Sequence, residues 1–451
     1  MHTCTQWRRI ILAFPSSLQL HLHCTYGVPI ADMLKYSPPL PILIDFQGNR
    51  SMSQKDEDGA LLALQQHNRV RLIYLRQASM NKFFPAMNKH FPMLEDLDLS
   101  FTGPDSALIA ETFTAPRLHH FDLVVHRWAQ RVPLLACVAG LVTLSIENIP
   151  FPDALPVKYL VSRLLLMPQL ECLSLEFYNF PSPIDFDKND LSELQTAQLP
   201  KLVRIVFRGG SSYLEDLMAR IRAPLLAGFM LSLPSTPLFP LSNLSGLLTA
   251  AEELRFPVLS VTFSESDEDL GSFITVAGTV DDASIHISFP CDDPVACASQ
   301  ICAALAPILW DVESLHLDYR PSRWTLGLLN RREVWSDLLR PFCNVQKLQV
   351  NSAMTSELSL ALCPKYGSPP EGILPKLCEF SVPDRERFQG MLDPFIAARK
   401  AAGQPIAKYF KKKYFRPPTP DPDSEEEAPR FGSDYDSLEE CSFSDPYEDF
   451  E

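Results

Sequence analysis

Apolar residues recur along the chain in a fixed order: a proline, one further residue, then Leu-x-x-Leu-x-Leu or a close apolar substitute. The last two apolar positions of each copy are two residues apart, so a strand directs both to one face and its polar neighbours to the other. Each copy is therefore predicted to form a strand with one buried and one exposed side. Clear copies begin at Pro92, Pro116, Pro168, Pro200 and Pro224.

Segments with helical spacing of apolar residues lie between the copies. Ser211 and Ser212, ahead of Glu215, have hydroxyl groups of the kind that cap free amides at a helix N-terminus. A proline then ends each helix and returns the chain to an extended form. Strand, turn, helix and proline thus make one structural unit. We expect helices at Ser106–Phe113, Val157–Leu166, Leu214–Ile221, Ala296–Ile308 and Trp335–Leu339.

Weaker copies extend the array in both directions, to about ten units. They begin at Val70, Leu141, Val312, Val345 and Leu377. Residues 233–290 fit poorly, because strand-like runs are present but the order of apolar residues is blurred. Either the units are longer there or the array is irregular. The sequence predicts an α/β solenoid with irregular repeats of about 24–33 residues, an architecture that usually binds rather than catalyses.

Charge is concentrated in the C-terminal tail. The chain has a net charge of −15, and residues 421–451 hold thirteen acidic residues and one arginine, which leaves only −3 for the preceding 420 residues. A nearly neutral body lacks the broad basic face of nucleic-acid binders, so we expect no nucleic-acid partner. The tail has too little apolar surface to offset its chain entropy, and we expect it to be disordered.

The cysteines and the hydropathy of the chain indicate the cellular compartment of the protein. Eleven cysteines, an odd number without Cys-x-x-Cys pairs, suit buried thiols in a reducing compartment better than a disulfide framework. No stretch approaches 18 uninterrupted apolar residues, so no membrane span or membrane partner is expected. We predict a cytoplasmic and/or nuclear protein. Residues 411–413 are three lysines. They are a candidate nuclear-localisation signal, or else they neutralise the charge of the acidic tail.

A phrase near the N-terminus, Cys4-Thr-Gln-Trp7-Arg8, is similar to the last turn of an F-box. The following segments, 15–22, 24–29 and 38–45, match the way F-box chains of basidiomycete fungi run into their repeats. The repeated apolar order at 60–390 resembles the divergent leucine-rich repeats of the same proteins. The resemblance implies a leucine-rich-repeat horseshoe that acts as a non-catalytic, substrate-binding subunit related to F-box components of a cullin-based ubiquitin ligase.

Only the last part of an F-box is present. Docking onto the ligase adaptor is therefore expected only if the F-box is completed upstream of Met1, with Trp7 and Arg8 as the remnant of the adaptor-binding surface. A stand-alone scaffold that binds a constitutive protein partner, without any ubiquitin link, remains the alternative. The predicted organisation is an F-box remnant (1–14), a linking segment (15–59), the solenoid (60–400), a basic-aromatic segment (401–416) and a disordered acidic tail (417–451).

The strand positions between the core leucines would line the concave face of the horseshoe, where a protein partner is expected. In successive units these positions change from acidic residues to arginines, a gradient that would select a complementary protein surface. Water-facing strand positions are polar in any half-exposed sheet, so a purely structural interpretation stays open. The candidate partner-binding residues are Asp96, Asp98, His120, Asp122, Glu147, Glu176, Arg204 and Arg208.

Histidine and cysteine positions do not form a metal-binding or catalytic pattern. His119 and His120 are neighbours on a predicted strand and point to opposite faces. The cluster at 21–24 (His-Leu-His-Cys) lacks the second pair of ligands that tetrahedral zinc needs. Aspartates at 292 and 293 place the wrong charge beside the cysteines at 291, 297 and 302 for a reactive thiol.

The remaining motifs predict no chemistry within the chain. Residues 208–212 (Arg-Gly-Gly-Ser-Ser) lack the P-loop pattern, and a turn between strand and helix explains them. We therefore predict no enzyme activity, no cofactor and no metal. Candidate phosphorylation sites in the tail, which would recruit a basic partner, are Thr419, Ser424, Ser433 and Ser437.

Overall fold

The computed structural model divides into two units, Met1–Lys412 and Lys413–Glu451, and every described residue belongs to the first. The structure describes residues 20–47, 52–78, 80–101, 113–125, 139–150, 152–178, 195–237, 239–251, 253–265, 272–280, 283–320, 332–351, 354–362, 373–382, 393–406 and 408–410.

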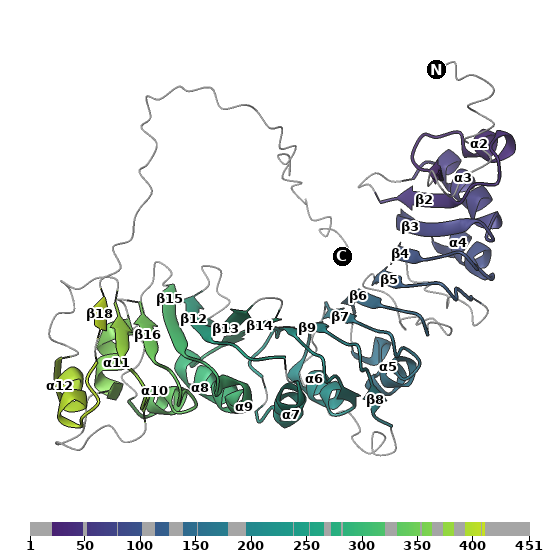
Figure 1. Cartoon of the computed structure of the whole chain (residues 1–451). Coiled ribbons are helices and arrows are strands. Elements are labelled where there is room, and N and C mark those ends of the chain that lie inside the picture. The colour runs from purple at the N-terminus through teal and green to yellow at the C-terminus, as the bar shows by residue number, and fades with distance from the viewer. Residues whose placement is uncertain are drawn as a thin grey trace, which may run out of the picture. The chain divides into compact units, whose positions relative to one another are not determined.

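One long sheet, with 16 strands in the described residues, forms the body of the first unit (Figure 1). Its strands are β1 (Leu22–Cys24), β2 (Ile42–Phe46), β3 (Val70–Ala78), β4 (Asp96–Phe101), β5 (His120–Val124), β6 (Thr143–Ile149), β7 (Cys172–Phe177), β9 (Arg204–Arg208), β11 (Gly228–Ser232), β12 (Val258–Glu265), β13 (Ser272–Val280), β14 (Ala283–Cys291), β15 (Ser314–Arg320), β16 (Lys347–Val350), β17 (Glu379–Ser381) and β18 (Lys408–Phe410). Two short strands, β8 (Ala197–Gln198) and β10 (Ile221–Arg222), form a separate parallel pair.

The repeated apolar order forms strands throughout. All five clear copies and all five weaker ones coincide with a strand of the long sheet, and from β1 to β11 its neighbours pair in parallel in chain order. Parallel neighbours require a crossover between them, and helices occupy several of these crossovers. The predicted α/β leucine-rich-repeat solenoid is confirmed.

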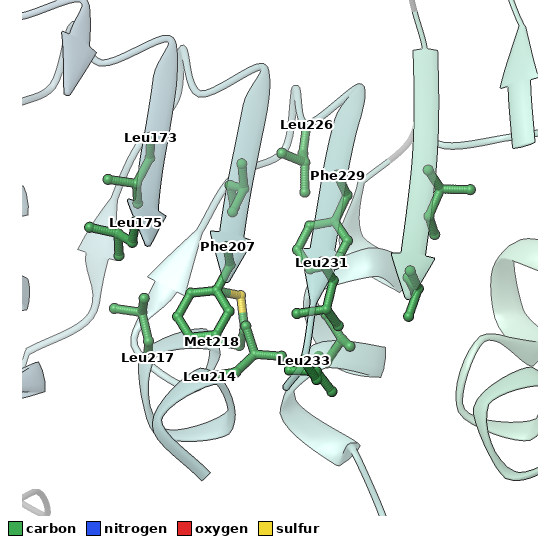
Figure 2. Close-up of a cluster of buried hydrophobic side chains, with 14 of the residues drawn as sticks. Leu173, Leu175, Phe207, Leu214, Leu217, Met218, Leu226, Phe229, Leu231 and Leu233 are labelled. Atoms are coloured by element: carbon green, nitrogen blue, oxygen red, sulfur yellow. The ribbon is translucent and has the colours of Figure 1, made fainter. Parts of the chain in front are cut away.

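Two rows of apolar side chains run from strand to strand and make the core. The first joins Ile44, Ile73, Leu97, Phe121, Leu144, Leu173, Ile205, Phe229 and Ile285 through the strand register. The second lies two residues further along each strand, and both rows are at most 1% exposed. Figure 2 shows both rows on β7 and β11 and Phe207 of the second row on β9, with Leu214, Leu217 and Met218 of a helix packed beneath them.

Helices line the face of the sheet that carries these rows (Figure 1). They are α2 (Ile30–Tyr36), α3 (Gln54–Gln65), α4 (Met80–Met87), α5 (Val157–Leu164), α6 (Ser211–Met218), α7 (Ser242–Ala250), α8 (Pro294–Ala304), α9 (Ala306–Leu309), α10 (Arg332–Leu339), α11 (Thr355–Leu362) and α12 (Asp393–Ala401), together with the 3-10 turn Pro152–Ala154.

Four of the five expected helices are present, with different bounds. Helix α5 ends at Leu164 rather than Leu166, and α10 begins at Arg332, three residues before the expected Trp335. The segment expected as one helix at Ala296–Ile308 is two, because Pro307 cannot donate the backbone hydrogen bond that a continuous helix needs. Helix α6 starts one turn earlier than expected, and its N-cap is Gly210, without a side-chain capping bond, rather than a serine. The fifth segment, Ser106–Phe113, lies outside the described residues except for Phe113.

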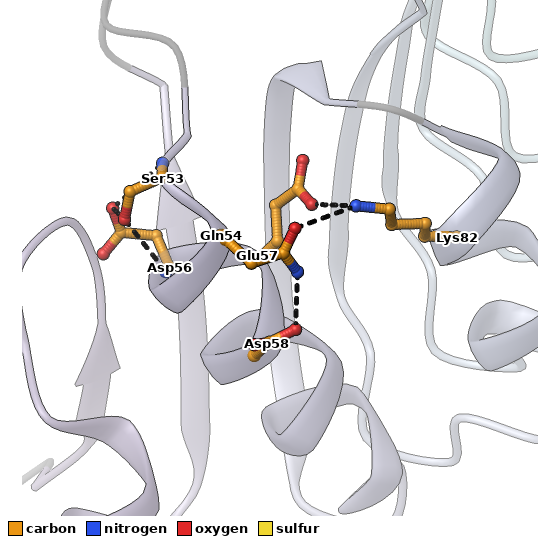
Figure 3. A network of polar contacts seen from close by, with 6 residues as sticks. All are labelled: Ser53, Gln54, Asp56, Glu57, Asp58 and Lys82. Carbon is orange, nitrogen blue, oxygen red and sulfur yellow. Dashed lines mark hydrogen bonds and ion pairs between the residues drawn. The ribbon is translucent and has the colours of Figure 1, made fainter.

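Helix α3 is fixed by polar contacts at its start (Figure 3). The Ser53 hydroxyl accepts from the Asp56 backbone amide at 3.2 Å, and the Asp56 carboxylate accepts from the Ser53 amide at 3.3 Å, which is a capping box. Lys82 of α4 pairs with Glu57 and donates to the Gln54 side chain. The contact from Lys82 ties neighbouring units together, although a partly exposed ion pair contributes at most about 1 kcal/mol.

Residues 233–290 depart from the regular order of strands. β11 pairs in parallel with β14, whereas β12 lies three places further along the sheet, beside β15. β13 runs antiparallel between β12 and β14. Of the two interpretations left open by the sequence, longer units or an irregular array, the structure shows an irregular array, interrupted by an antiparallel strand.

The sheet reaches beyond the predicted solenoid at both ends. β1 pairs with β2, and β2 pairs with β3, although residues 15–59 were expected to form a link. β18, inside the basic-aromatic segment 401–416, pairs in parallel with β17. Both segments therefore add strands to the same sheet.

Candidate functional site

The face of the sheet opposite the helices is called the open face here. Its central row, set by the strand register, runs Asp45, Tyr74, Asp98, Asp122, Ser145, Ser174, Val206, Met230 and His286. These residues alternate with the core rows along each strand, as the pleat requires. Most of the sequence-predicted site residues belong to this row or to the rows beside it.

Three carboxylates gather around one arginine on β3 to β6. Arg76 donates to Asp98 through Nη2 at 2.9 Å and through Nε at 3.2 Å, and both bonds go to Oδ2. Its guanidinium also interacts with the charges of Asp122 and Glu147. We call Asp98, Asp122 and Glu147 the carboxylate cluster. Within it, negative charge exceeds the one guanidinium that the described residues place there.

Two oxygen atoms of the carboxylate cluster are buried without a partner. The Asp98 side chain is 8% exposed, and its Oδ1 makes no hydrogen bond in the described structure. The Oδ1 of Asp122 is in the same state. A buried acceptor without a donor costs about 1–3 kcal/mol. Such atoms mark a place where an additional donor would be stabilising.

The pKa values of two cluster members show the same excess of negative charge. Burial raises the pKa of Asp122, and the charge of Asp98 adds to the rise, while a hydrogen bond with Ser145 opposes it. Burial also raises the pKa of Glu147, followed by repulsion from Asp122 and Glu176. The pKa of Arg76 is raised as well, chiefly by its hydrogen bond to Asp98. For an arginine a raised pKa means that the charged form is favoured, whereas for the two carboxyl groups it means that the charged form is disfavoured. A further cation near the cluster would favour the ionised carboxylates.

The arginines of β9 lie beyond the carboxylate cluster along the sheet, as in the expected change from acidic residues to arginines. Arg208 Nη1 lies 2.9 Å from Glu176 Oε1 on the neighbouring strand, so these two predicted site residues pair with each other. Because Arg208 is exposed and Glu176 is only half-buried, the pair contributes at most about 1 kcal/mol. Arg204 is exposed, and its side chain lies across Gly228, where an added Cβ would come within 3.2 Å of the Arg204 Cγ.

Asp96 and His120 lie in the neighbouring row, where the register pairs them directly. Asp96 is half-buried and His120 is exposed. The charge of Asp96 helps raise the pKa of Tyr74, after the larger effect of burial. They therefore border the carboxylate cluster.

Sequence reasoning missed the residues that complete the cluster. Arg76 and Tyr74 belong to β3, which was recognised as a weak copy beginning at Val70, but their positions were not followed into the site. Gln47 also donates to Asp98 Oδ2, at 3.4 Å. The available signal was positional, because Tyr74 occupies the same place in its copy as Asp98 does in the next.

Other sequence motifs give no competing site among the described residues. No group of three or more His, Cys, Asp or Glu residues there could hold a metal ion. Gly209 and Gly210 form the turn from β9 into α6. No helix within the described ranges is long and apolar enough to cross a membrane. Trp7, Arg8 and the tail sites Thr419, Ser424, Ser433 and Ser437 lie outside the described residues.

Comparisons with known proteins add little. No protein-family model matches the chain, and no curated protein matches it in sequence. The leucine-rich repeat-containing protein LegL7 from Legionella pneumophila is a similar solved structure, with 12% identity over 73% of this chain and 97% of that chain and a TM-score of 0.27. At that TM-score the similarity carries no argument. The strand order and the core rows themselves define the architecture as an α/β solenoid of repeated strand–helix units.

Proposed function

We propose that the chain is a non-catalytic protein-recognition module, and that its open face binds a partner through a basic segment of that partner. The carboxylate cluster is the observation that carries this proposal. It combines excess negative charge with two buried oxygens that lack donors. An arginine of the partner could donate to such oxygens in a charge-assisted, bidentate geometry.

Charge complementarity of this kind favours selectivity and fast association. The strand backbone already holds the carboxylates side by side, so a partner needs to supply only the missing donors. Binding should weaken as salt rises, because part of the attraction acts over the range that ions screen.

The test measures binding of a short peptide to the full chain by fluorescence anisotropy. The probe is fluorescein-labelled Gly-Arg-Arg-Gly-Ser-Gly, and Gly-Ser-Ser-Gly-Ser-Gly is its uncharged counterpart. The double variant Asp122→Asn/Glu147→Gln should bind the arginine probe at least about tenfold more weakly, because one charge-assisted bond contributes about 1.5–3 kcal/mol. Neutral side chains remove the cost of burying charge and the repulsion that together raise both pKa values, so lost binding would not reflect lost folding.

A matched control removes two charges from the helix side. Asp32→Asn/Asp58→Asn changes exposed residues of α2 and α3. It removes two negative charges, the same number as Asp122→Asn/Glu147→Gln. It should leave the affinity within about twofold. Equal weakening by both double variants, or no difference between the two probes, would contradict docking at the carboxylate cluster.

The resemblance of residues 4–8 to an F-box supports a finer form of the proposal, in which the module is a substrate-binding subunit of a cullin-based ubiquitin ligase, acting in the cytoplasm or nucleus. Crosslinking of the tagged full chain in cell extract tests it. Recovery of the ligase adaptor and cullin supports this form. A single stoichiometric partner without ligase subunits would instead favour the stand-alone scaffold.

A further inference from the structure

An apolar surface lies on the open face in the same row as the carboxylate cluster. Val206 of β9 and Met230 of β11 are direct neighbours in the strand register. Met230 is 49% exposed, and Val206 is half-buried. The core residues Phe207, Phe229 and Leu231 of these strands lie on the helix side (Figure 2), so Val206 and Met230 alternate to the open face. We call these two residues the apolar pair.

Only two short side chains separate the apolar pair from the cluster along the row. Ser145 follows Asp122 on the next strand, Ser174 follows Ser145, and Val206 follows Ser174. Both serines are half-buried. Short hydroxyl side chains leave room for an extended backbone to pass over them, and a hydroxyl can both donate to and accept from a peptide group.

We infer that the partner segment bound by the open face is an extended peptide that crosses the strands, with a basic residue at the carboxylate cluster and an apolar side chain on Val206 and Met230. This inference rests on the proposed function and specifies its ligand. The unbranched methionine side chain adapts its shape to different apolar groups, which suits such a contact.

The strand spacing sets the distance between the two anchor residues of the peptide. Four steps separate the strand of Asp122 from that of Met230, in the order β5, β6, β7, β9 and β11. At about 4.8 Å per step, the two positions are about 19 Å apart. An extended peptide advances about 3.3 Å per residue, so the basic and apolar residues should be about six positions apart.

Neighbouring side chains bound the apolar pair on one side. Arg204 lies two residues before Val206 on β9 and covers Gly228, which lies two residues before Met230 on β11. The arginine stem therefore occupies the surface next to the pair. An apolar side chain of the ligand would meet methionine, valine and the aliphatic part of Arg204, which together can shield it from water.

The experiment uses the full chain and fluorescein-labelled peptides of the form Arg-Arg, glycine-serine spacer, Leu. The leucine is placed two, six or twelve positions from the nearer arginine, and each peptide is made in both orders. The six-position peptide in its better order should bind about tenfold more tightly than the two-position peptide and than a six-position peptide with serine in place of leucine. The twelve-position peptide should fall between, because a longer flexible spacer reduces effective concentration.

Three substitutions test whether the leucine of the peptide binds at the apolar pair or nonspecifically at any exposed apolar side chain. Met230→Ser should remove the advantage of leucine, whereas Leu225→Ser, which changes a side chain that is 50% exposed just before β11, should leave it unchanged. Val206→Thr should reduce the advantage in part, because it replaces a methyl group by a hydroxyl of similar size.

The outcomes distinguish a failure of this inference from a failure of the proposed function. If basic peptides bind, Asp122→Asn/Glu147→Gln weakens them, and neither spacing nor Met230→Ser matters, then the two-anchor ligand is wrong while the proposed function stands. If no arginine peptide binds at low salt, both are wrong. Equal loss from Met230→Ser and Leu225→Ser would also overturn the role of the apolar pair.

Discussion

Two adjacent glycines after β9 provide a sharp test of the packing between strand and helix. A Cβ built on Gly209 would lie 2.6 Å from Phe207 Cζ and 2.9 Å from Phe177 Cδ2. A Cβ on Gly210 would have no atom within 4 Å. Neither glycine has a positive φ, so backbone strain is not the issue. The substitution Gly209→Ala should therefore destabilise the protein through contact with aromatic rings, and Gly210→Ala should not.

The rings at Gly209 have little freedom to move away. Phe207 and Phe177 are each 1% exposed, and both pack against the buried ring of Tyr213, with centroid distances of 6.1 and 4.7 Å. Overpacking of a filled core costs about 1–3 kcal/mol. For Gly210→Ala, the weaker N-cap preference of alanine and the lower entropy of the unfolded chain oppose each other, which leaves a change within about 0.5 kcal/mol.

Urea unfolding followed by circular dichroism gives the free energy of unfolding of each variant, provided that the slopes with denaturant agree. A rescue adds a second measurement: Phe207→Leu shortens the side chain in closest contact, so Gly209→Ala should cost less in that background than in the wild type. Equal stability of Gly209→Ala and Gly210→Ala, or additive effects of Gly209→Ala and Phe207→Leu, would refute the reasoning.

Three further predictions concern buried polar groups. Because the pKa of Asp122 is raised above its ordinary value of 3.8, the native state binds this proton more tightly than the unfolded state, and the carboxyl makes stability fall as pH rises from about 4 through the raised pKa. Asp122→Asn should therefore be more stable relative to wild type at pH 7 than at pH 4 in urea unfolding, and an equal difference at both pH values would contradict this. Tyr213 is only 3% exposed and donates to the Leu155 carbonyl at 2.7 Å, so Tyr213→Phe should lower the free energy of unfolding by about 1–3 kcal/mol. The exposed control Tyr178→Phe should change it by less than about 0.5 kcal/mol. An equally small loss for Tyr213→Phe would contradict a stabilising bond to Leu155. Burial raises the pKa of the Cys302 thiol to about 12. Iodoacetamide at pH 8 should therefore label exposed Cys378 in the native protein and Cys302 only after unfolding, as measured by peptide mass spectrometry. Equal labelling rates of the two cysteines in the native protein would be inconsistent with the packing of α8.

The site shows where sequence reasoning reaches its limit. Asp98 and Asp122 could be placed on one row because each occupies the same position in its own repeat. The partner of Asp98 could not be identified in the same way, because Arg76 lies beyond the apolar phrase of a weak copy, where the register between β3 and β4 shifts. The pairing of Glu176 with Arg208 joins residues 32 positions apart, so two residues of the expected charge gradient neutralise each other.

By itself, the sequence determined the strands of the repeated apolar order, their buried leucines and the residues that alternate to the opposite face. It could do so because each repeat packs mainly on its neighbours, so the local apolar order carries the information for the whole array. Only the tertiary structure decided that β14, and not β12, follows β11 in the sheet. That choice depends on which long strands pair across the insertion, and pairing between distant segments leaves no periodic trace along the chain. The same holds for the carboxylate cluster, whose charge balance arises from side chains that four separate strands bring together.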